Sequence, residues 1–355
     1  MMNKRHHRFI CLVTGIIGFW GILGVNSLTS YADSAESAYS VSANIPEEQT
    51  NKDVSYFDLT EAPNETRDLS IHLSNVGEKE SVFEIEINNA ATNTNGVIDY
   101  NQRTVKKDAS AKYQVSDCLT TDAKEVTIPA GEAKDVHFQL KMPKESFDGI
   151  LLGGIHVTKK ENQSEKVSGT AIRNKYAYVI GVELRNNSKP VSPDLKLISV
   201  RTGLQNSYAT IFAHLQNPTS TIISQVHTEA TITKKGSSKV LYTANKDHMS
   251  IAPNTNFDFP ISVNKKKIDP GTYMLTVDAT TENNQKKWHL AKTFTIKPEN
   301  AKKINDEAIT EEKAEVSYLP MIIGIGGLLL GIIAFLSYCS NKKVGEEGNE
   351  KAKSE

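Results

Sequence analysis

Histidine and cysteine are the residues in the central sequence with the widest chemistry, because they bind metals and act as nucleophiles, acids and bases. The histidines show neither the H-E-x-x-H nor the H-x-H spacing of zinc sites, and Cys118 has no C-x-x-C partner. We therefore predict no metal site and no bound cofactor. The histidines concerned are His72, His137, His156, His214, His227, His248 and His289.

Sequence motifs of common enzymes are also missing. There is no G-x-S-x-G turn, and Gly153-Gly154 is followed by neither Lys-Ser/Thr nor a helix, so these glycines indicate a bulge or a close backbone approach in a strand. Two carboxylates about 5–10 Å apart could still hydrolyse a glycan, and 42 acidic residues form such pairs easily by coincidence. We predict no catalysis; the alternative is an envelope glycan hydrolase or an accessory subunit of one.

Aromatic residues are the candidates for ligand binding, with ordinary packing as the alternative for each of them. The stretch from Asn88 to Asp122 is polar, has Asn95-Gly96 as its tight turn and matches no calcium-loop spacing. We predict a solvated loop there, and long loops on a rigid sandwich often carry binding. The aromatic candidates are Tyr56, Phe57, Tyr100, Tyr113 and Tyr208.

The residues around these candidates alternate between apolar and polar, which is typical of strands with one buried face. The alternation is clear from Leu69 to Leu73 and from Tyr176 to Leu184. Val126–Ile128 and Val136–Leu140 flank Pro129–Glu132, and this arrangement predicts a hairpin with a Pro/Gly connection.

A second series of strands follows a break at Asn186–Pro193, where two prolines among polar residues mark a linker. Alternation resumes at Leu195 and continues to Ile296. About seven strands in roughly a hundred residues is the count of an immunoglobulin-like domain. We predict an all-β protein with two tandem immunoglobulin-like β-sandwich domains. The charged residues after Ile296 form a stalk or a short helix, and the sequence does not decide between them.

The amino terminus has the three parts of a secretory signal peptide. Basic side chains precede an uncharged stretch from Phe9 to Val25, and the small residues Ser30 and Ala32 flank a cleavage site after Ala32. The apolar stretch is longer than usual, so an uncleaved anchor is the alternative.

The carboxyl-terminal region contains 20 uncharged residues from Leu319 to Tyr338, enough for a helix of about 30 Å that crosses the hydrocarbon core. Tyr318 and Tyr338 stand where interfacial aromatic residues belong, and Lys342 and Lys343 mark the cytoplasmic side. A buried core helix is the alternative. We predict a single membrane span with the amino-terminal bulk outside the cell.

The whole-chain properties agree with this layout. A net charge of −1 creates no field that would attract nucleic acid. A disulfide-free outer part fits a bacterial surface with one membrane and a wall. The predicted segments are a signal peptide at 1–32, an N-terminal sandwich at 33–188, a C-terminal sandwich at 189–298, a charged stalk at 299–317, a transmembrane helix at 318–340 and a cytoplasmic tail at 341–355.

Eight short segments occur in an order that resembles one known family. They are SYFDLTEAPNETRDLSIHLSN (55–75), TIPAGEAKDVHFQLKMP (127–143), GGIHV (153–157), YAYVIGVELRNN (176–187), HLQNPTSTIISQV (214–226), MSIAPNTNFDFPI (249–261), PGTYMLTVDA (270–279) and WHLAKTFTI (288–296). Together they resemble the WxL-interacting proteins of low-GC Gram-positive bacteria over nearly the whole chain. One departure is Pro63-Asn64, where the family pattern has Pro-Gly; asparagine tolerates a left-handed turn.

The resemblance implies roles that spacing alone does not show. It implies a first domain that binds peptidoglycan and a second that binds host matrix or partner ligands. The predicted partners are peptidoglycan, WxL-domain surface proteins, host extracellular-matrix proteins and the membrane through one span, with no nucleic acid. No individual binding residue is carried over from the family.

Overall fold

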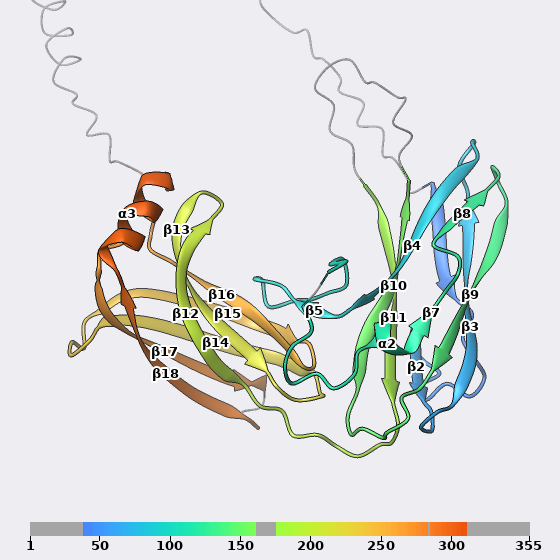
Figure 1. Cartoon of the computed structure of the whole chain (residues 1–355), viewed down its shortest axis with the longest axis horizontal. Coiled ribbons are helices and arrows are strands. Elements are labelled where there is room, and N and C mark those ends of the chain that lie inside the picture. Colours follow the sequence, from blue (N-terminus) through green and yellow to red (C-terminus); the bar gives the residue numbers. More distant parts are fainter. Residues whose placement is uncertain (1–37, 105, 161–174, 283–284, 311–355) are drawn as a thin grey trace, which may run out of the picture. The chain divides into compact units, whose positions relative to one another are not determined.

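The computed structural model describes residues 38–104, 106–160, 175–282 and 285–310, and these residues are mostly β-strand in several sheets (Figure 1). The prediction of a mostly β protein is confirmed. The predicted signal peptide with Ser30 and Ala32 lies outside the described residues, as does the predicted span with its flanks Tyr318, Leu319, Tyr338, Lys342 and Lys343. None of the helices in the described ranges is long and apolar enough to cross a membrane.

The chain divides into two compact units. Of the described residues, the first unit contains 38–88, 115–146 and 153–184, and the second unit contains 89–114, 147–152 and 185–310. The polypeptide therefore passes between the units more than once. Residues 89–114, which we call the arm, precede much of the first unit in sequence but belong to the second.

The first unit has a four-stranded and a five-stranded sheet. Apolar side chains that alternate along the strands are buried, as at Leu69, Ile71 and Leu73, because successive strand residues point to opposite faces. The four-stranded sheet has the order β1 (Tyr39–Ala43), β3 (Thr66–Asn75), β9 (Ala133–Lys141) and β7 (Leu119–Thr120). The five-stranded sheet has the order β2 (Phe57–Thr60), β11 (Ala177–Arg185), β10 (Leu151–Lys159), β4 (Ser81–Asn89) and β8 (Glu125–Ile128). Helix α2 (Val115–Cys118) leads into β7.

The predicted hairpin across Pro129–Glu132 is wrong. Strand β8 pairs with β4 in one sheet, and β9 pairs with β3 in the other. The turn is a corner at which the chain changes sheets. Gly131 adopts a φ of 74°, so the predicted glycine turn exists, but it connects two layers and not two paired strands.

The second unit has a three-stranded and a four-stranded sheet, whose inner faces share one apolar core. The three-stranded sheet has the order β12 (Lys196–Gln205), β13 (Tyr208–Asn217) and β16 (Thr255–Ser262). The four-stranded sheet has the order β15 (Val240–Ile251), β14 (Ile223–Lys234), β17 (Gly271–Thr281) and β18 (Lys287–Ile296). The arm contributes a small hairpin of β5 (Ala91–Thr92) and β6 (Ile98–Asp99).

Helix α3 (Pro298–Glu307) follows β18, so these residues form a short helix and not an extended stalk. Ala301 and Ile304 are buried in the core of the second unit. The side chain of Asn305 accepts a hydrogen bond from the backbone N–H of Ile268 at 2.8 Å and donates one to its carbonyl at 2.9 Å. This helix is therefore part of the folded unit (Figure 1).

A buried asparagine ends the same strand in both units. Asn75 and Asn217 are both 0% exposed. The side-chain amide of each donates to the carbonyl four residues ahead, at Lys79 (2.9 Å) and Thr221 (2.8 Å). The side-chain oxygen of each accepts from the backbone N–H two residues ahead.

The same asparagines also hold the corner that leads to the opposite sheet. Asn75 donates to the carbonyl oxygens of Ile128 and Pro129, and Asn217 donates to that of Ala252. Three residues before each asparagine, His72 and His214 face Asp135 and Asp258 across the sheet at 2.8 and 3.0 Å. The two units are therefore repeats of one design, and the sequence H-L-x-N marks each copy.

The strands of the repeats correspond in chain order and in sheet order. Seven strands of each unit correspond. In the smaller sheets, β1, β3 and β9 match β12, β13 and β16 in that order. In the larger sheets, β11, β10, β4 and β8 match β18, β17, β14 and β15 in that order. The first unit adds β7 beside β9 and β2 beside β11. The addition of β2 arises because the chain leaves the first sheet after β1, whereas β12 continues into a tight turn at Asn206-Ser207 and returns directly as β13.

We expect Asn217→Ala to lower the free energy of unfolding of the second unit by about 2–4 kcal/mol, because buried backbone groups lose their partners. Chemical denaturation of the wild type and the variant measures the change. Asn245→Ala is the control, since Asn245 lies exposed in β15 and should change the free energy by less than about 0.5 kcal/mol. Equal effects at the two positions would contradict the role of Asn217.

Candidate functional site

The structure separates the aromatic candidates between the two units. Tyr56 and Phe57 belong to the first unit, where Phe57 is 0% exposed and forms part of the core. Tyr56 is half-buried, and its ring lies against Gly181 of β11, where an added Cβ would be 3.4 Å from the Cβ of Tyr56. Of these two, only Tyr56 presents a ring surface.

Tyr100, Tyr113 and Tyr208 belong to the second unit and are half-buried. The ring of Tyr113 packs against Phe147 with 6.1 Å between the centroids. It also lines a small cavity of about 20 Å³, roughly the space for one water molecule. Tyr208 follows the β12–β13 turn, with the ammonium of Lys265 5.3 Å from its ring centroid. Tyr113 and Tyr208 therefore have different neighbours.

The arm packs on the edges of β15 and β16 within the second unit. The hydroxyl of Thr92 accepts from the backbone N–H of Ala252 at 2.9 Å and contacts the hydroxyl of Thr255 at 3.1 Å. The carbonyl of Gly96 accepts from the N–H of Ser250 at 2.8 Å. Gly96 has a φ of 67°, and an added Cβ would lie 2.5 Å from the side chain of Met249, so the predicted Asn95-Gly96 turn needs its glycine.

Asp108 fixes the other half of the arm. Its carboxylate is 7% exposed and accepts hydrogen bonds from Ser110, from Gln216 of β13 and from Asn256 of β16. Burial alone would raise the pKa of Asp108, but the hydrogen bonds outweigh it and the pKa lies below its ordinary value. The loop expected to be solvated is thus held by a buried, ionised side chain.

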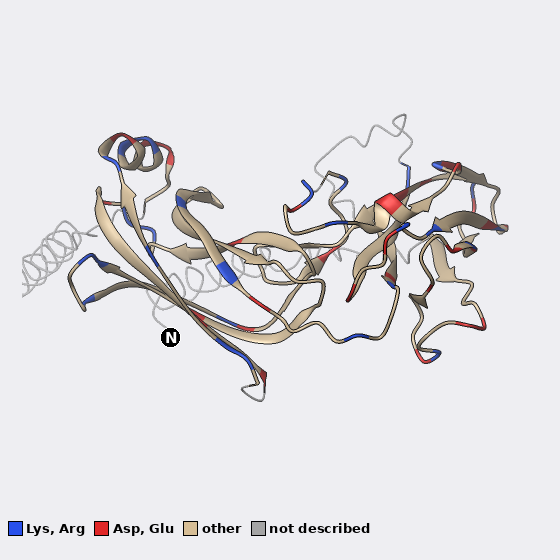
Figure 2. Ribbon diagram, turned by 60° about the horizontal axis from the view of Figure 1, so that its bottom comes forward, with Lys and Arg blue, Asp and Glu red and all other residues tan. Residues whose placement is uncertain are grey.

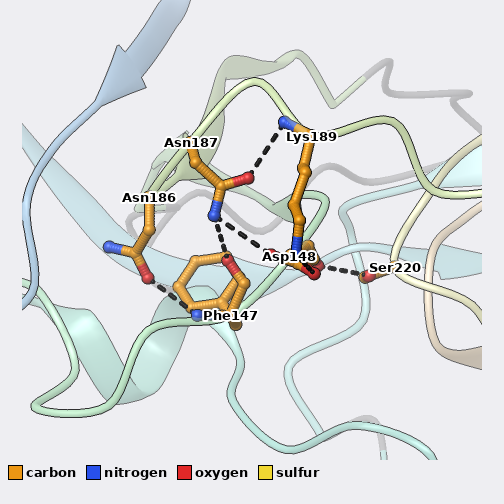
Figure 3. A network of polar contacts seen from close by, with 6 residues as sticks. All are labelled: Phe147, Asp148, Asn186, Asn187, Lys189 and Ser220. Carbon is orange, nitrogen blue, oxygen red and sulfur yellow. Dashed lines mark hydrogen bonds and ion pairs between the residues drawn. The ribbon is translucent and has the colours of Figure 1, made fainter.

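The predicted linker is also held in place, by the network drawn in Figure 3. Asn187 donates to the carbonyl of Phe147 at 3.2 Å and to the carboxylate of Asp148 at 3.1 Å. Lys189 forms an ion pair with Asp148 at 2.9 Å, and Ser220 donates to the Asp148 carbonyl at 2.6 Å. Lys189 holds the pKa of Asp148 below its ordinary value.

The turn beside this network depends on one glycine. Gly149 has a φ of 84°, and an added Cβ would lie 2.2 Å from the carbonyl oxygen of Ser220. Residues 147–149 and the linker therefore form one fixed connection within the second unit.

Histidines and aspartates pair repeatedly across strands, at His72–Asp135, His214–Asp258, His289–Asp278 and His227–Asp247. These pairs lie partly or mainly in solvent. His156 differs because it is buried, with Nδ1 3.6 Å from Glu86. Across the described part of the chain, no three or more histidine, cysteine, aspartate or glutamate residues are grouped to hold a metal.

The charges of each unit are mixed in sign, and Figure 2 shows lysine, arginine, aspartate and glutamate interspersed along the ribbon. Cys118 is buried.

A shallow groove of about 420 Å³ lies between β12 and β18, the edge strands of the two sheets of the second unit. Its lining combines apolar side chains with two lysines and one histidine. The lining residues are Lys196, Leu197, Ile198, His289, Leu290, Ala291 and Lys292. None of them is among the aromatic candidates for binding, and the exposure of Ile198 is visible only in the structure.

Comparison with known proteins assigns both halves of the chain. The WxL Interacting Protein peptidoglycan binding domain matches residues 39–159, and the WxL Interacting Protein host binding domain matches residues 167–306. The chain belongs to the WxL Interacting Protein family. The predicted family is confirmed, and both matched domains are binding domains. No curated protein matches this chain.

Several solved structures resemble the chain in fold. The E. coli chaperone DraB is 12% identical and has a TM-score of 0.28, with 73% of this chain and 95% of that chain covered. The YadV chaperone is 11% identical with a TM-score of 0.28, and the match covers 73% of this chain and all of that chain. The Pseudomonas aeruginosa CupB2 chaperone is 10% identical with a TM-score of 0.27, covering 64% and 91%.

We expect Asp108→Asn to destabilise the second unit at neutral pH, because its amide nitrogen would face the donor of either Gln216 or Asn256, which bond different oxygens of Asp108. The folded pKa of Asp108 is lowered, so its stabilisation is complete above the unfolded value of about 3.9 and is lost as pH falls through the folded pKa. Urea unfolding at pH 7 and pH 3 should show a gap between wild type and variant that narrows at pH 3.

Asp306→Asn is the matched control for this comparison, since Asp306 is exposed on α3. It should leave the urea midpoint unchanged at both pH values. If wild type and Asp108→Asn differ in urea midpoint by the same amount at pH 7 and at pH 3, stabilisation by the ionised carboxylate of Asp108 would be contradicted.

Proposed function

We propose that the chain is a non-catalytic binding and scaffold protein of the cell surface. It attaches to peptidoglycan through its first unit and to WxL-domain proteins or host matrix ligands through its second. The single observation that supports this proposal most is the match of both regions to the two binding domains of the WxL Interacting Protein family. The groove between β12 and β18 gives the second unit a surface suited to a protein ligand.

The proposal includes the fold and the anchoring of the chain. Both units are immunoglobulin-like sandwiches, supported by the matching order of their seven shared strands. A signal peptide at 1–32 directs export, a helix at 318–340 spans the membrane once, and residues 341–355 form the cytoplasmic tail. The domain limits 33–188 and 189–298 follow the sequence, with the arm serving the second domain structurally.

The aromatic candidates take different places in this proposal. Tyr56 is the candidate wall contact of the first unit, because its ring covers Gly181 at the sheet surface. Tyr100, Tyr113 and Tyr208 are candidates for the partner side. The contribution of Phe57 is to hold β2 in the core.

Retention on purified cell walls tests the proposal directly. We expect the detergent-solubilised full chain to sediment with walls, and Tyr56→Ala to reduce the retained fraction several-fold because a stacking surface is lost. Tyr242→Ala is a matched tyrosine control in the second unit and should sediment like the wild type. Failure of the wild type to sediment would refute wall binding, and a cleared zone in a wall-containing gel would favour a hydrolase.

Protease accessibility tests the orientation. We expect protease added to wall-stripped cells to remove the region 33–317, because that region lies outside the membrane in this proposal. Immunoblotting with antibodies to both ends follows the fragments. Protection of this region in intact wall-stripped cells, with loss only after lysis, would contradict the proposed topology.

A further inference from the structure

The repeats differ at one sheet edge, and this difference carries a further inference. In the first unit the outer edge of β11 is paired with β2. In the second unit the corresponding strand is β18, and no strand of the described residues pairs with its outer edge. An unpaired edge presents backbone N–H and C=O groups that can bind another extended segment.

The burial of side chains shows what the added strand does in the first unit. The core-facing residues of β11 beside β2 are buried, with Ile180 at 8% and Val182 and Leu184 at 0% exposure. On β18 the corresponding apolar residues Trp288 and Leu290 are only half-buried. On the neighbouring strand β17 the core-facing residues Tyr273, Leu275, Val277 and Ala279 are all buried, so the lower burial of core-facing residues is seen at β18 and not at β17.

The gap left at this edge is the groove between β12 and β18. Helix α3 closes the end of the gap near Ile296 by burying Ala301 and Ile304 in the core. The other end stays open, and there the side chain of Ile198 is 42% exposed. Ile198 is the extra residue of a bulge in β12, where the pairing with β13 shifts between Leu197 and Ser199.

Two lysines line the groove near its open end. Lys292 of β18 donates to the carbonyl of Ile198 at 2.7 Å, and Lys196 lies on the facing strand. The nearest carboxylate on the neighbouring strand, Asp278, is paired with His289 at 2.6 Å. Two ammonium groups beside a carboxylate that is already hydrogen-bonded to a histidine favour an acidic ligand, and lysines on an edge also discourage unspecific strand pairing.

We propose that the open edge of β18 and its groove bind an extended segment of a partner protein that carries apolar residues and an acidic residue on one face. The strand would add to β18, place its apolar side chains against Leu290 and Ile198, and offer a carboxylate two residues further along the same face to Lys196 and Lys292. The chain's own β2 is the template, since it pairs at the equivalent edge and Phe57, Leu59 and the following Glu61 stand two residues apart on one face. This inference rests on the proposed partner-binding role of the second unit.

A peptide with the sequence of residues 55–62 is the probe, labelled with fluorescein and titrated against the full chain in detergent. We expect saturable binding by anisotropy and slower hydrogen exchange of backbone amides in β18. Lys292→Glu should weaken binding at least tenfold, and Ile198→Ser several-fold. Both side chains are exposed, so folding is not at stake. The matched control Lys266→Glu changes an exposed lysine outside the groove and should bind like the wild type.

A second peptide, with lysine in place of its acidic residues, tests the charge argument. It should bind the wild type more than tenfold more weakly than the first peptide and regain affinity for Lys292→Glu. Binding without protection of β18 would overturn strand addition. An equal loss in Lys266→Glu would overturn the site, and binding of a heparin fragment in preference to the acidic peptide would assign the groove to an anionic glycan.

Wall retention of the same variants separates this inference from the proposed function. Lys292→Glu should sediment with walls like the wild type, because the first unit is unchanged. If the wild type fails to sediment but binds the peptide, strand binding at the groove is supported and wall attachment is refuted. If the wild type sediments but does not bind the peptide, strand binding is refuted and wall attachment is retained.

Discussion

The fold depends on satisfying backbone polar groups where the chain crosses between two sheets. A sandwich corner brings peptide groups into the interior, and unpaired groups there are costly. A buried asparagine meets this need because its amide donates two hydrogen bonds while its oxygen accepts others. Asn75 and Asn217 make the same set of contacts to the turn ahead and to the opposite corner. In each unit, one asparagine side chain at the corresponding position satisfies the backbone groups of this corner.

From this shared frame, the two units diverge at their edges. After β1 the chain of the first unit crosses to the other sheet and covers β11 with β2, whereas β12 stays in its sheet. Because the edge of β11 is already paired, a ligand of the first unit would bind to the faces of its sheets and not to that edge. An open edge with half-buried apolar residues can take a strand from another protein. The two domains that the family names distinguish therefore also differ in the pairing of their edge strands.

Alternation in the sequence predicted most strands, as at β3, β11 and β13, because one face of each is buried. It missed β15, in which the polar run Asn245–His248 interrupts the apolar pattern and no residue before Met249 is buried. The corner at Pro129–Glu132 has the same turn chemistry as a hairpin, so local residues could not distinguish them. Asp108 looked like any loop aspartate, since its partners Gln216 and Asn256 are more than a hundred residues away. The H-L-x-N repeat was readable and would have revealed the duplication.

Because of the arm, the boundaries of the domains matched by sequence differ from the boundaries of the folded units. Residues 89–114 lie inside the match to the peptidoglycan binding domain, yet they fold with the second unit. A fragment that begins at residue 189 would leave the side chains of Gln216 and Asn256 without Asp108 and would uncover Met249. Exposed apolar surface and unsatisfied amides both cost stability. The packing of the second unit therefore depends on residues that lie within the match to the first domain.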